Sequence, residues 1–245
     1  MLNENIGLID SGVGGLSVLK ELLKIMPDES YVYFGDNKNA PYGDKTDDEL
    51  FRLAVKDIDF CSDFGLKALV CACNTLSLKL ADKIRYYTKI PTFFVYPPQE
   101  VCSVKYKKTL LIATTASIAS LPKISGITYF APEGLVSAIE NLAAYNINVD
   151  LNIYLPFKEK EFECVILGCT HFSLLKNEIF DHLKPLECYC GETFTAKQVE
   201  KNIKKKKSLG ICRRNPVLFV GENAEINKNF WNKVVNTPQK NNKNT

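Results

Sequence analysis

The chain has 245 residues, with 31 Lys plus Arg against 28 Asp plus Glu and a formal net charge of +3. This near balance excludes the concentrated basic charge of a typical nucleic-acid-binding domain, so we expect no nucleic-acid partner. The N-terminus, MLNENIGLID, has no basic region followed by an apolar stretch, and no apolar run approaches the ~20 residues of a membrane-spanning helix. We therefore expect a soluble, cytoplasmic protein with no membrane partner.

Apolar runs of strand length recur along the chain and usually end in a turn of small residues. In chain order they cover residues 6–9, 31–34, 68–72, 92–96, 109–112, 164–167 and 217–220. Helical spacing of apolar residues predicts helices over 16–25, 47–60, 76–87, 196–203 and 223–234. Runs that are apolar throughout are typical of strands covered on both faces. The sequence thus predicts an α/β fold with mostly parallel sheets and a ligand site beyond the carboxyl ends of the strands.

Two of these strand-turn-helix units look like copies of one design. Residues 66–78 and 162–175 each place a cysteine, Cys73 or Cys169, at a strand end before hydroxyl or amide residues and an apolar helix. The similarity predicts two pseudo-symmetric α/β domains, with helices flanking their sheets and the active site in the cleft between them.

The domain division follows from a break in the pattern near residues 88–98, where three prolines suit a crossing between domains. We expect the last strand and helix to return to the first domain. The lysine run at 204–207 is expected to face solvent. The predicted division is a first domain over 1–95 and 208–235, a second over 96–207, and a disordered tail, rich in Asn and Lys, over 236–245.

Cysteine is the one unusual entry in the composition, with nine residues. An odd number in a reducing compartment argues against a disulfide framework. The pairs Cys71/Cys73 and Cys188/Cys190 are C-x-C, unlike the C-x₂₋₄-C of structural zinc sites, and the chain has only two histidines. We therefore expect no metal, and expect seven of the nine cysteines to be packing residues.

Cys73 and Cys169 are the exceptions because each stands at the predicted start of a helix. The helix N-terminus lowers a thiol pKa and attracts anions. Taken singly, either cysteine also fits a simple core position at a strand end. Two thiols that face each other across a cleft are suited to removing and adding a proton on opposite faces of one carbon, which is a racemase or epimerase arrangement.

The turn Asp10-Ser-Gly-Val-Gly-Gly follows the first strand and invites a phosphate-binding interpretation. It lacks the lysine of a P-loop and fits G-x-G-x-x-G poorly, so nucleotide binding is weakly supported. The alternative is a tight turn that lets a helix pack closely. In either case Asp10 and Ser11 should point polar atoms into the cleft. Asp36 has the same position after the second strand, where an aspartate is commonly only a helix cap.

With these residues assembled, the sequence resembles the glutamate racemases, a cofactor-independent family that supplies D-glutamate for bacterial peptidoglycan. The resemblance is spread over most of the chain, and the order and spacing of its motifs make it specific. The motifs are Ile6-Gly-Leu-Ile-Asp10-Ser-Gly-Val-Gly-Gly-Leu, Tyr33-Phe-Gly-Asp36, Ala40-Pro-Tyr-Gly43-Asp-Lys, Cys73-Asn-Thr, Ala113-Thr-Thr-Ala-Ser117 and Gly168-Cys-Thr-His171.

The resemblance implies that Cys73 and Cys169 are the two acid/base residues, with Cys73 acting on D-glutamate and Cys169 on L-glutamate. It implies assistance from Asp10 and Asp36 near Cys73 and from His171 near Cys169. It further implies glutamate as substrate, no cofactor, a homodimer, and DNA gyrase as a partner of some members. The implied substrate contacts are Asp10, Ser11, Tyr42, Gly43, Asn74, Thr75, Ser117, Thr170 and His171.

The chain departs from the family pattern outside these turns. It is short between Ser117 and Cys169, Pro97 stands where an acidic residue is frequent, and residues 188–193 replace a segment that usually contains Asp-Ser. These changes concern the domain crossing, activator binding and dimer geometry more than the chemistry. Three alternatives stay open: a racemase of aspartate or another acidic amino acid, a binding or regulatory protein on the same fold, and a thiol redox protein, which the lack of C-x-x-C disfavours.

Overall fold

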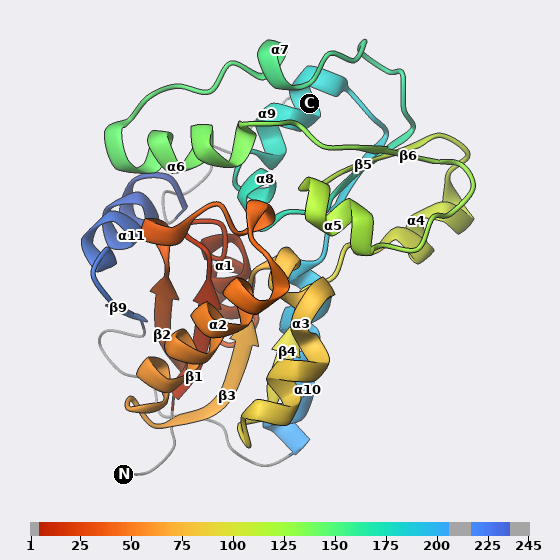
Figure 1. Ribbon diagram of the computed structural model, residues 1–245. Helices are drawn as coiled ribbons and strands as arrows, with labels where there is room; N and C mark the ends of the chain where they lie inside the picture. The colour runs from red at the N-terminus through yellow and green to blue at the C-terminus, as the bar shows by residue number, and fades with distance from the viewer. Residues whose placement is uncertain (1–4, 206–216, 236–245) are drawn as a thin grey trace.

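The structure, a computed structural model, describes residues 5–205 and 217–235. Two parallel sheets, each flanked by helices, make up this part of the chain, which confirms the predicted α/β fold (Figure 1). The predicted tail at 236–245, the end of the lysine run and Cys212 lie outside the described residues. None of the helices within the described ranges is long and apolar enough to cross a membrane.

The first sheet has five strands in the order β4-β3-β1-β2-β9, and every neighbouring pair is parallel. Its strands are β1 (Asn5–Asp10), β2 (Ser30–Gly35), β3 (Leu66–Cys71), β4 (Thr92–Phe94) and β9 (Val217–Val220). The placement of β9 beside β2 confirms that the chain returns to the first sheet after leaving the second.

Helices cover both faces of this sheet because successive strand residues point to opposite sides. Leu8 points into a core with α1 (Leu16–Ile25) and α10 (Glu192–Lys205), whereas Ile9 points into a core with α2 (Asp47–Ser62) and α3 (Asn74–Tyr87). A capping box between Thr46 and Glu49 fixes the start of α2. Both cores contain fully buried strand residues, which is why the strands are apolar throughout.

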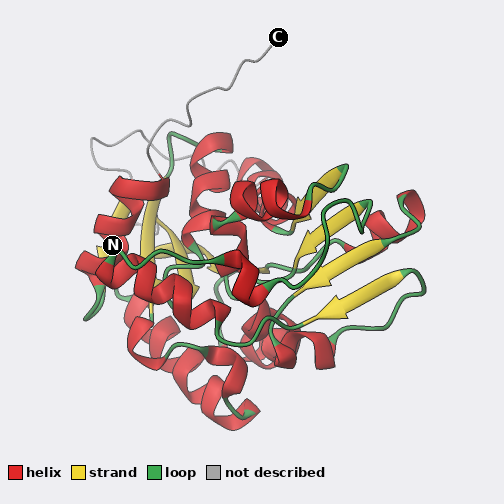
Figure 2. Ribbon diagram, turned by 90° about the horizontal axis from the view of Figure 1, so that it is seen from above, coloured by secondary structure: helices red, strands yellow, loops and turns green. Residues whose placement is uncertain are grey.

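The second sheet has four parallel strands in the order β6-β5-β7-β8, which lie side by side in Figure 2. They are β5 (Thr109–Ile112), β6 (Ile127–Phe130), β7 (Cys164–Leu167) and β8 (Glu187–Cys190). The helices of this unit are α4 (Gln99–Lys105), α5 (Thr115–Ser120), α6 (Leu135–Tyr145), α7 (Leu151–Tyr154), α8 (Thr170–Leu174) and α9 (Lys176–Leu183). Figure 1 shows this unit above the carboxyl ends of the first sheet.

The chain returns through α10, and it ends in β9, α11 (Ala224–Phe230) and a π-helical turn (Trp231–Val235). Our division assigned residues 96–207 to the second domain, yet α10 packs against α1 and β4 and so lies on the first sheet. The Ala196, Val199 and Ile203 side chains of α10 are buried in the same core as α1. The two sheets themselves separate where expected, with β4 before residue 96 and β5 after it.

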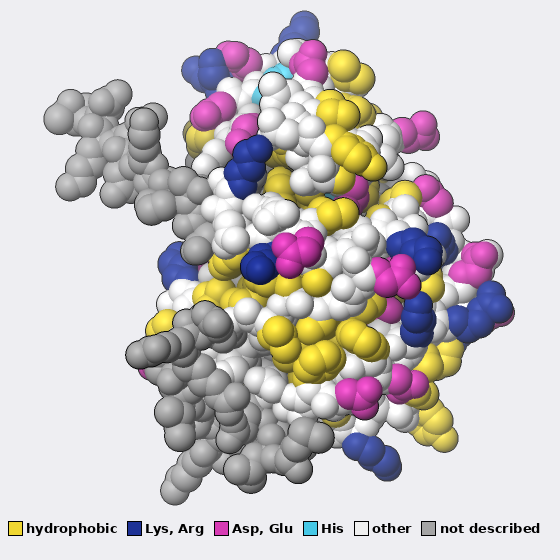
Figure 3. All heavy atoms as spheres, turned by 90° about the vertical axis from the view of Figure 1, so that its left-hand side faces the viewer, with side chains coloured by type: hydrophobic (Ala, Val, Ile, Leu, Met, Phe, Trp, Pro, Cys, Tyr) yellow, Lys and Arg dark blue, Asp and Glu magenta, His cyan; other side chains and the backbone are white. Residues whose placement is uncertain are grey.

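The surface carries charges of both signs. On the face drawn in Figure 3, Lys and Arg side chains alternate with Asp and Glu, and an exposed pair, Lys38 with Glu222, joins opposite charges. That face therefore shows no concentrated basic region within the described residues.

Candidate active site

A pocket with about 260 Å³ of empty space lies between the two units, at the carboxyl ends of both sheets. Nine of the residues predicted for the site line it: Ser11, Tyr42, Gly43, Cys73, Asn74, Thr75, Cys169, Thr170 and His171. Pro41, Thr114 and Val136 complete the lining. The fold thus brings residues from the ends of β1, β3, β5 and β7 around one cavity, although they are up to 160 positions apart in the chain.

Cys73 occupies the position immediately before α3, two residues beyond the end of β3. Its Sγ donates to Ser11 Oγ at 3.8 Å, and the side chain is buried. Burial raises the pKa of Cys73 to about 12, and the neighbouring Asp10 acts in the same direction, whereas a hydrogen bond from the backbone of Leu76 opposes them. Cys73 is therefore a thiol in the unliganded protein at neutral pH.

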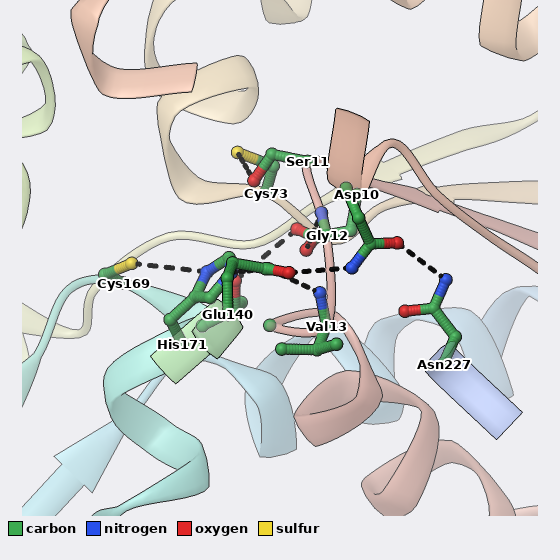
Figure 4. A network of polar contacts seen from close by, with 12 residues as sticks. Asp10, Ser11, Gly12, Val13, Cys73, Glu140, Cys169, His171 and Asn227 are labelled. Atoms are coloured by element: carbon green, nitrogen blue, oxygen red, sulfur yellow. Dashed lines mark hydrogen bonds and ion pairs between the residues drawn. The ribbon is translucent and has the colours of Figure 1, made fainter. Parts of the chain in front are cut away.

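Cys169 occupies the equivalent position before α8, two residues beyond the end of β7. Its Sγ lies 3.9 Å from Nδ1 of His171, and the opposite ring nitrogen, Nε2, lies 2.6 Å from Oε1 of Glu140 (Figure 4). Burial alone lowers the pKa of His171, but the contacts with Cys169 and Glu140 outweigh it and raise the pKa well above its usual value. His171 is thus an imidazolium, whose two N–H groups point at Glu140 and at Cys169.

Glu140 is the site residue that the sequence reasoning missed. It extends from α6 of the second unit to the first unit, where it accepts hydrogen bonds from the Val13 backbone N–H at 2.8 Å and from Asn37 Nδ2 at 2.7 Å. Burial raises its pKa, but the hydrogen bond and charge of His171, together with Asn37 and Val13, lower it overall, so Glu140 is a carboxylate. One signal was available: Glu140 is the only charged residue of α6, LVSAIENLAAY.

The glycines of the turn after β1 have a purpose that this carboxylate and α8 explain. A Cβ at Gly12 would overlap the Glu140 carboxylate, and one at Gly14 would lie 2.7 Å from Thr170 Oγ1 and overlap His171. Close packing, the alternative to phosphate binding considered above, therefore accounts for these glycines, and the groups that approach belong to the second unit.

Asp10 and Asp36 lie behind the pocket lining. Asp10 is fully buried; its Oδ2 accepts from the Gly12 N–H at 3.1 Å and its Oδ1 from Thr170 Oγ1 at 3.5 Å. Burial raises the pKa of Asp10, while His171 lowers it. Asp36 accepts a hydrogen bond from the hydroxyl of Tyr42 at 2.8 Å. The structure thus connects Asp36 to Tyr42, a lining residue, rather than directly to Cys73.

Three hydroxyls meet where α3 and α5 face each other. Thr75 Oγ1 lies 3.2 Å from Thr114 Oγ1 and 3.3 Å from Ser117 Oγ, and Thr114 donates to Ser117 at 2.9 Å. Ser117 is fully buried behind this group, whereas Thr75 and Thr114, which the sequence reasoning did not single out, line the pocket. Thr114 is also the N-cap of α5.

The lining contains hydroxyl, amide and thiol groups, a histidine and the starts of helices, but no Lys or Arg among the described residues. Such a set recognises an anionic ligand through O–H and N–H donors and the imidazolium of His171. Groups of three or more His, Cys, Asp or Glu with metal-site geometry do not occur within residues 5–205 and 217–235. Of the remaining cysteines there, Cys61, Cys71, Cys102, Cys164 and Cys188 are buried and Cys190 is half-buried, all as free thiols.

Comparisons with known proteins give this site a family. No family model matches the chain. A glutamate racemase of Clostridium novyi (strain NT) is 34% identical over 250 residues, which cover 91% of this chain and 92% of the relative. One of Clostridium perfringens (strain SM101) is 32% identical over 243 residues, covering 92% and 93%. The chain belongs to the glutamate racemase family.

Solved glutamate racemases share the fold. The enzyme of Thermus thermophilus, in complex with beta-chloro-D-alanine, has a TM-score of 0.74 and 30% identity, with 93% of each chain covered. The enzyme of Francisella tularensis, in complex with D-glutamate, has a TM-score of 0.73 and 26% identity, with 94% of each chain covered. An isoform from Bacillus anthracis has a TM-score of 0.76 and 26% identity, with 96% of this chain and 95% of that one covered.

Proposed function

We propose that this protein is an isomerase that interconverts L- and D-glutamate without a cofactor, with Cys73 and Cys169 as its two acid/base groups. One observation carries the proposal: the two thiols line a single pocket from opposite units, each at the start of a helix that follows a central strand. Family membership supports glutamate as the substrate. The lack of Lys and Arg in the described lining is compatible with this anion, since helix starts and hydroxyls supply donors.

The reaction requires one thiolate and one thiol at a time. The thiolate takes the proton from Cα of the bound amino acid, and the electron pair is delocalised into the α-carboxylate. The thiol on the opposite face then gives its proton to Cα, which inverts the configuration. The first sulfur ends as a thiol and the second as a thiolate, so atoms and charge balance and the reverse reaction exchanges the two roles.

The surroundings of the two sulfurs support a division of labour. Cys73 is a thiol in the free protein, as its raised pKa requires, and so is ready to donate. Cys169 has the imidazolium of His171 beside it, and an N–H aimed at sulfur stabilises the negative charge that the base must carry. This state removes a proton at Cys169 and delivers one from Cys73, which matches the L-to-D direction that the family resemblance implies.

The other site residues hold this arrangement. Glu140 orients the imidazolium and keeps it charged, and Asp10 accepts from Thr170 next to Cys169. Ser11, Asn74, Thr75 and the Tyr42-Gly43 segment are proposed to contact the substrate. Ser117 would contribute by supporting the two threonine hydroxyls beside it.

The test is racemisation itself. Purified protein and L-glutamate or D-glutamate should give a mixture of enantiomers, followed by circular dichroism, whereas Cys73→Ala and Cys169→Ala should each abolish it. Cys190→Ala, which alters a half-buried thiol away from the pocket, is the matched control and should be active. Full activity of either single variant would refute the two-cysteine mechanism, and a preference for aspartate in a substrate panel would refute glutamate as the substrate.

The cellular assignments rest on the resemblance alone and stay predictions. They are a cytoplasmic location, D-glutamate supply for peptidoglycan, a homodimer and gyrase binding. Gyrase inhibition by the Cys73→Ala variant would reveal a second role independent of catalysis.

A further inference from the structure

The hydroxyl of Tyr42 lies between two buried carboxyl groups. Tyr42 Oη is 2.8 Å from Oδ2 of Asp36 and 3.1 Å from Oδ2 of Asp57. Asp36 follows β2, Tyr42 begins the short helical turn Tyr42–Asp44, and Asp57 is in the middle of α2. Asp57 is 1% exposed and does not line the pocket, but it contacts the side chain of a residue that does.

One hydroxyl hydrogen cannot serve two carboxylates. Asp36 is supplied as an anion, because Nδ2 of Asn39 lies 2.9 Å from each of its oxygens and Tyr42 adds a third contact. Within residues 5–205 and 217–235, no donor besides Tyr42 reaches Asp57. If the Tyr42 hydrogen goes to Asp36, the short contact between Tyr42 Oη and Asp57 needs a second proton, and the Asp57 carboxyl is the group that can carry it.

The other groups around Asp57 favour the same protonation state. Asp36 faces it from the loop after β2, Cys71 from β3, and Lys56 and Cys61 lie near it on α2 itself. Burial first, and then the charge of Asp36, raise the pKa of Asp57 to about 7, whereas Tyr42 and Lys56 lower it less. The nearest cation therefore does not compensate for burial.

We propose that Asp57 is a protonated acid that donates to Tyr42 Oη while Tyr42 donates to Asp36, and that this relay positions the Tyr42 wall of the pocket for substrate. Asp57 is thus a positioning residue that acts through Tyr42, and this role rests on the function proposed above. When Asp57 loses its proton, two carboxylates compete for one hydrogen. Tyr42 then loses one of its two contacts, and the pocket wall loosens.

The kinetic test measures KM and kcat separately between pH 6 and pH 8.5. A hydrogen bond to a charged group changes an equilibrium by roughly tenfold or more, so we expect the KM of the unaltered protein to rise about three- to tenfold across this range. In Asp57→Asn the amide donates as the protonated acid does, and the difference in KM between the two ends of the range should disappear. Asp57→Leu, which has no donor, should have a raised KM at both ends.

The control is Asp63→Asn, which alters an exposed carboxylate at the end of the same helix and should retain the pH dependence of the unaltered protein. If Asp57→Asn also retains it, the proposal is wrong. If Asp57→Leu has an unaltered KM at pH 6, the relay does not position the pocket wall and the proposal is likewise overturned.

A second arm needs no turnover and separates this inference from the proposed function. In protein labelled with ¹³C at Cζ of its 11 tyrosines, the Tyr42 signal is assigned as the one missing from Tyr42→Phe. It should shift with pH around a midpoint near 7, and Asp57→Asn should abolish the shift. A Tyr42 signal that does not change with pH would overturn the relay even in an active racemase. A shift without any turnover on glutamate would retain the relay and reject the substrate.

Discussion

Replacing Glu140 by glutamine removes a negative charge that both units of the protein share. The carboxylate accepts from His171 and Val13 through Oε1 and from Asn37 through Oε2. An amide can keep its oxygen toward His171 and Val13, but its NH₂ group then faces the NH₂ of Asn37. Asn37 cannot simply turn over, because its own oxygen accepts from Asn227.

The expected cost follows from these contacts. A hydrogen bond to a charged group contributes about 1.5–3 kcal/mol, so Glu140→Gln should lower kcat/KM by roughly 10- to 150-fold. The pH profile should change as well. His171 has a pKa above its usual value, so its positive charge is present below that pKa and lost as pH rises through it. Without the carboxylate that pKa falls, and the alkaline loss of activity should move to lower pH.

The assay is racemisation by circular dichroism from pH 6 to pH 10, with Glu133→Gln as the control because Glu133 is exposed just before α6. A Glu140→Gln variant with kcat/KM within twofold of the unaltered protein and an unmoved alkaline limb would refute the role assigned to Glu140. A loss of activity with an unmoved limb would refute the electrostatic part of the reasoning.

Three further changes test the packing around the site. Gly14→Ala places a methyl group against Thr170 and His171, and should lower activity at least tenfold and stability by about 1–3 kcal/mol, measured by racemisation and urea unfolding. Thr46→Ala removes the capping box of α2 and should lower the free energy of unfolding by about 1 kcal/mol. Leu19→Ala empties a fully buried position on α1 and should cost about 2–5 kcal/mol. Val104→Ala, at a position 90% exposed, should stay within about 0.5 kcal/mol in the same urea experiment.

Sequence patterns predicted the strands that are buried on both faces. Thr109–Ile112, Cys164–Leu167 and Val217–Val220 occur with the expected bounds, because uninterrupted apolar runs identify covered strands directly. Strands β6 and β8 were missed. Both are edge strands of four residues and both are partly exposed, so their sequences, ITYF and ECYC, carry a weaker apolar signal.

The site was predictable where chemistry and local structure coincide in the sequence. Cys73 and Cys169 stand at the starts of helices after strands, and the structure brings both to one pocket. Glu140 and Asp57 were not predictable in this way, since each is one polar residue on a helix and its partners come from other elements. The placement of Asp36 behind Tyr42 was missed for the same reason: the turn after β2 is visible in the sequence, but the tyrosine that faces it is known only from the fold.

Deuterium incorporation during a single direction of the reaction tests the two-cysteine mechanism most directly. With L-glutamate in D₂O at low conversion, the proton that Cys169 removes and the deuteron that Cys73 delivers belong to different sulfurs. The mechanism therefore predicts deuterium at Cα of the D-glutamate formed and almost none in the remaining L-glutamate, with the mirror-image result from D-glutamate. Equal deuterium in product and remaining substrate would indicate a single base, and product without deuterium would contradict the mechanism altogether.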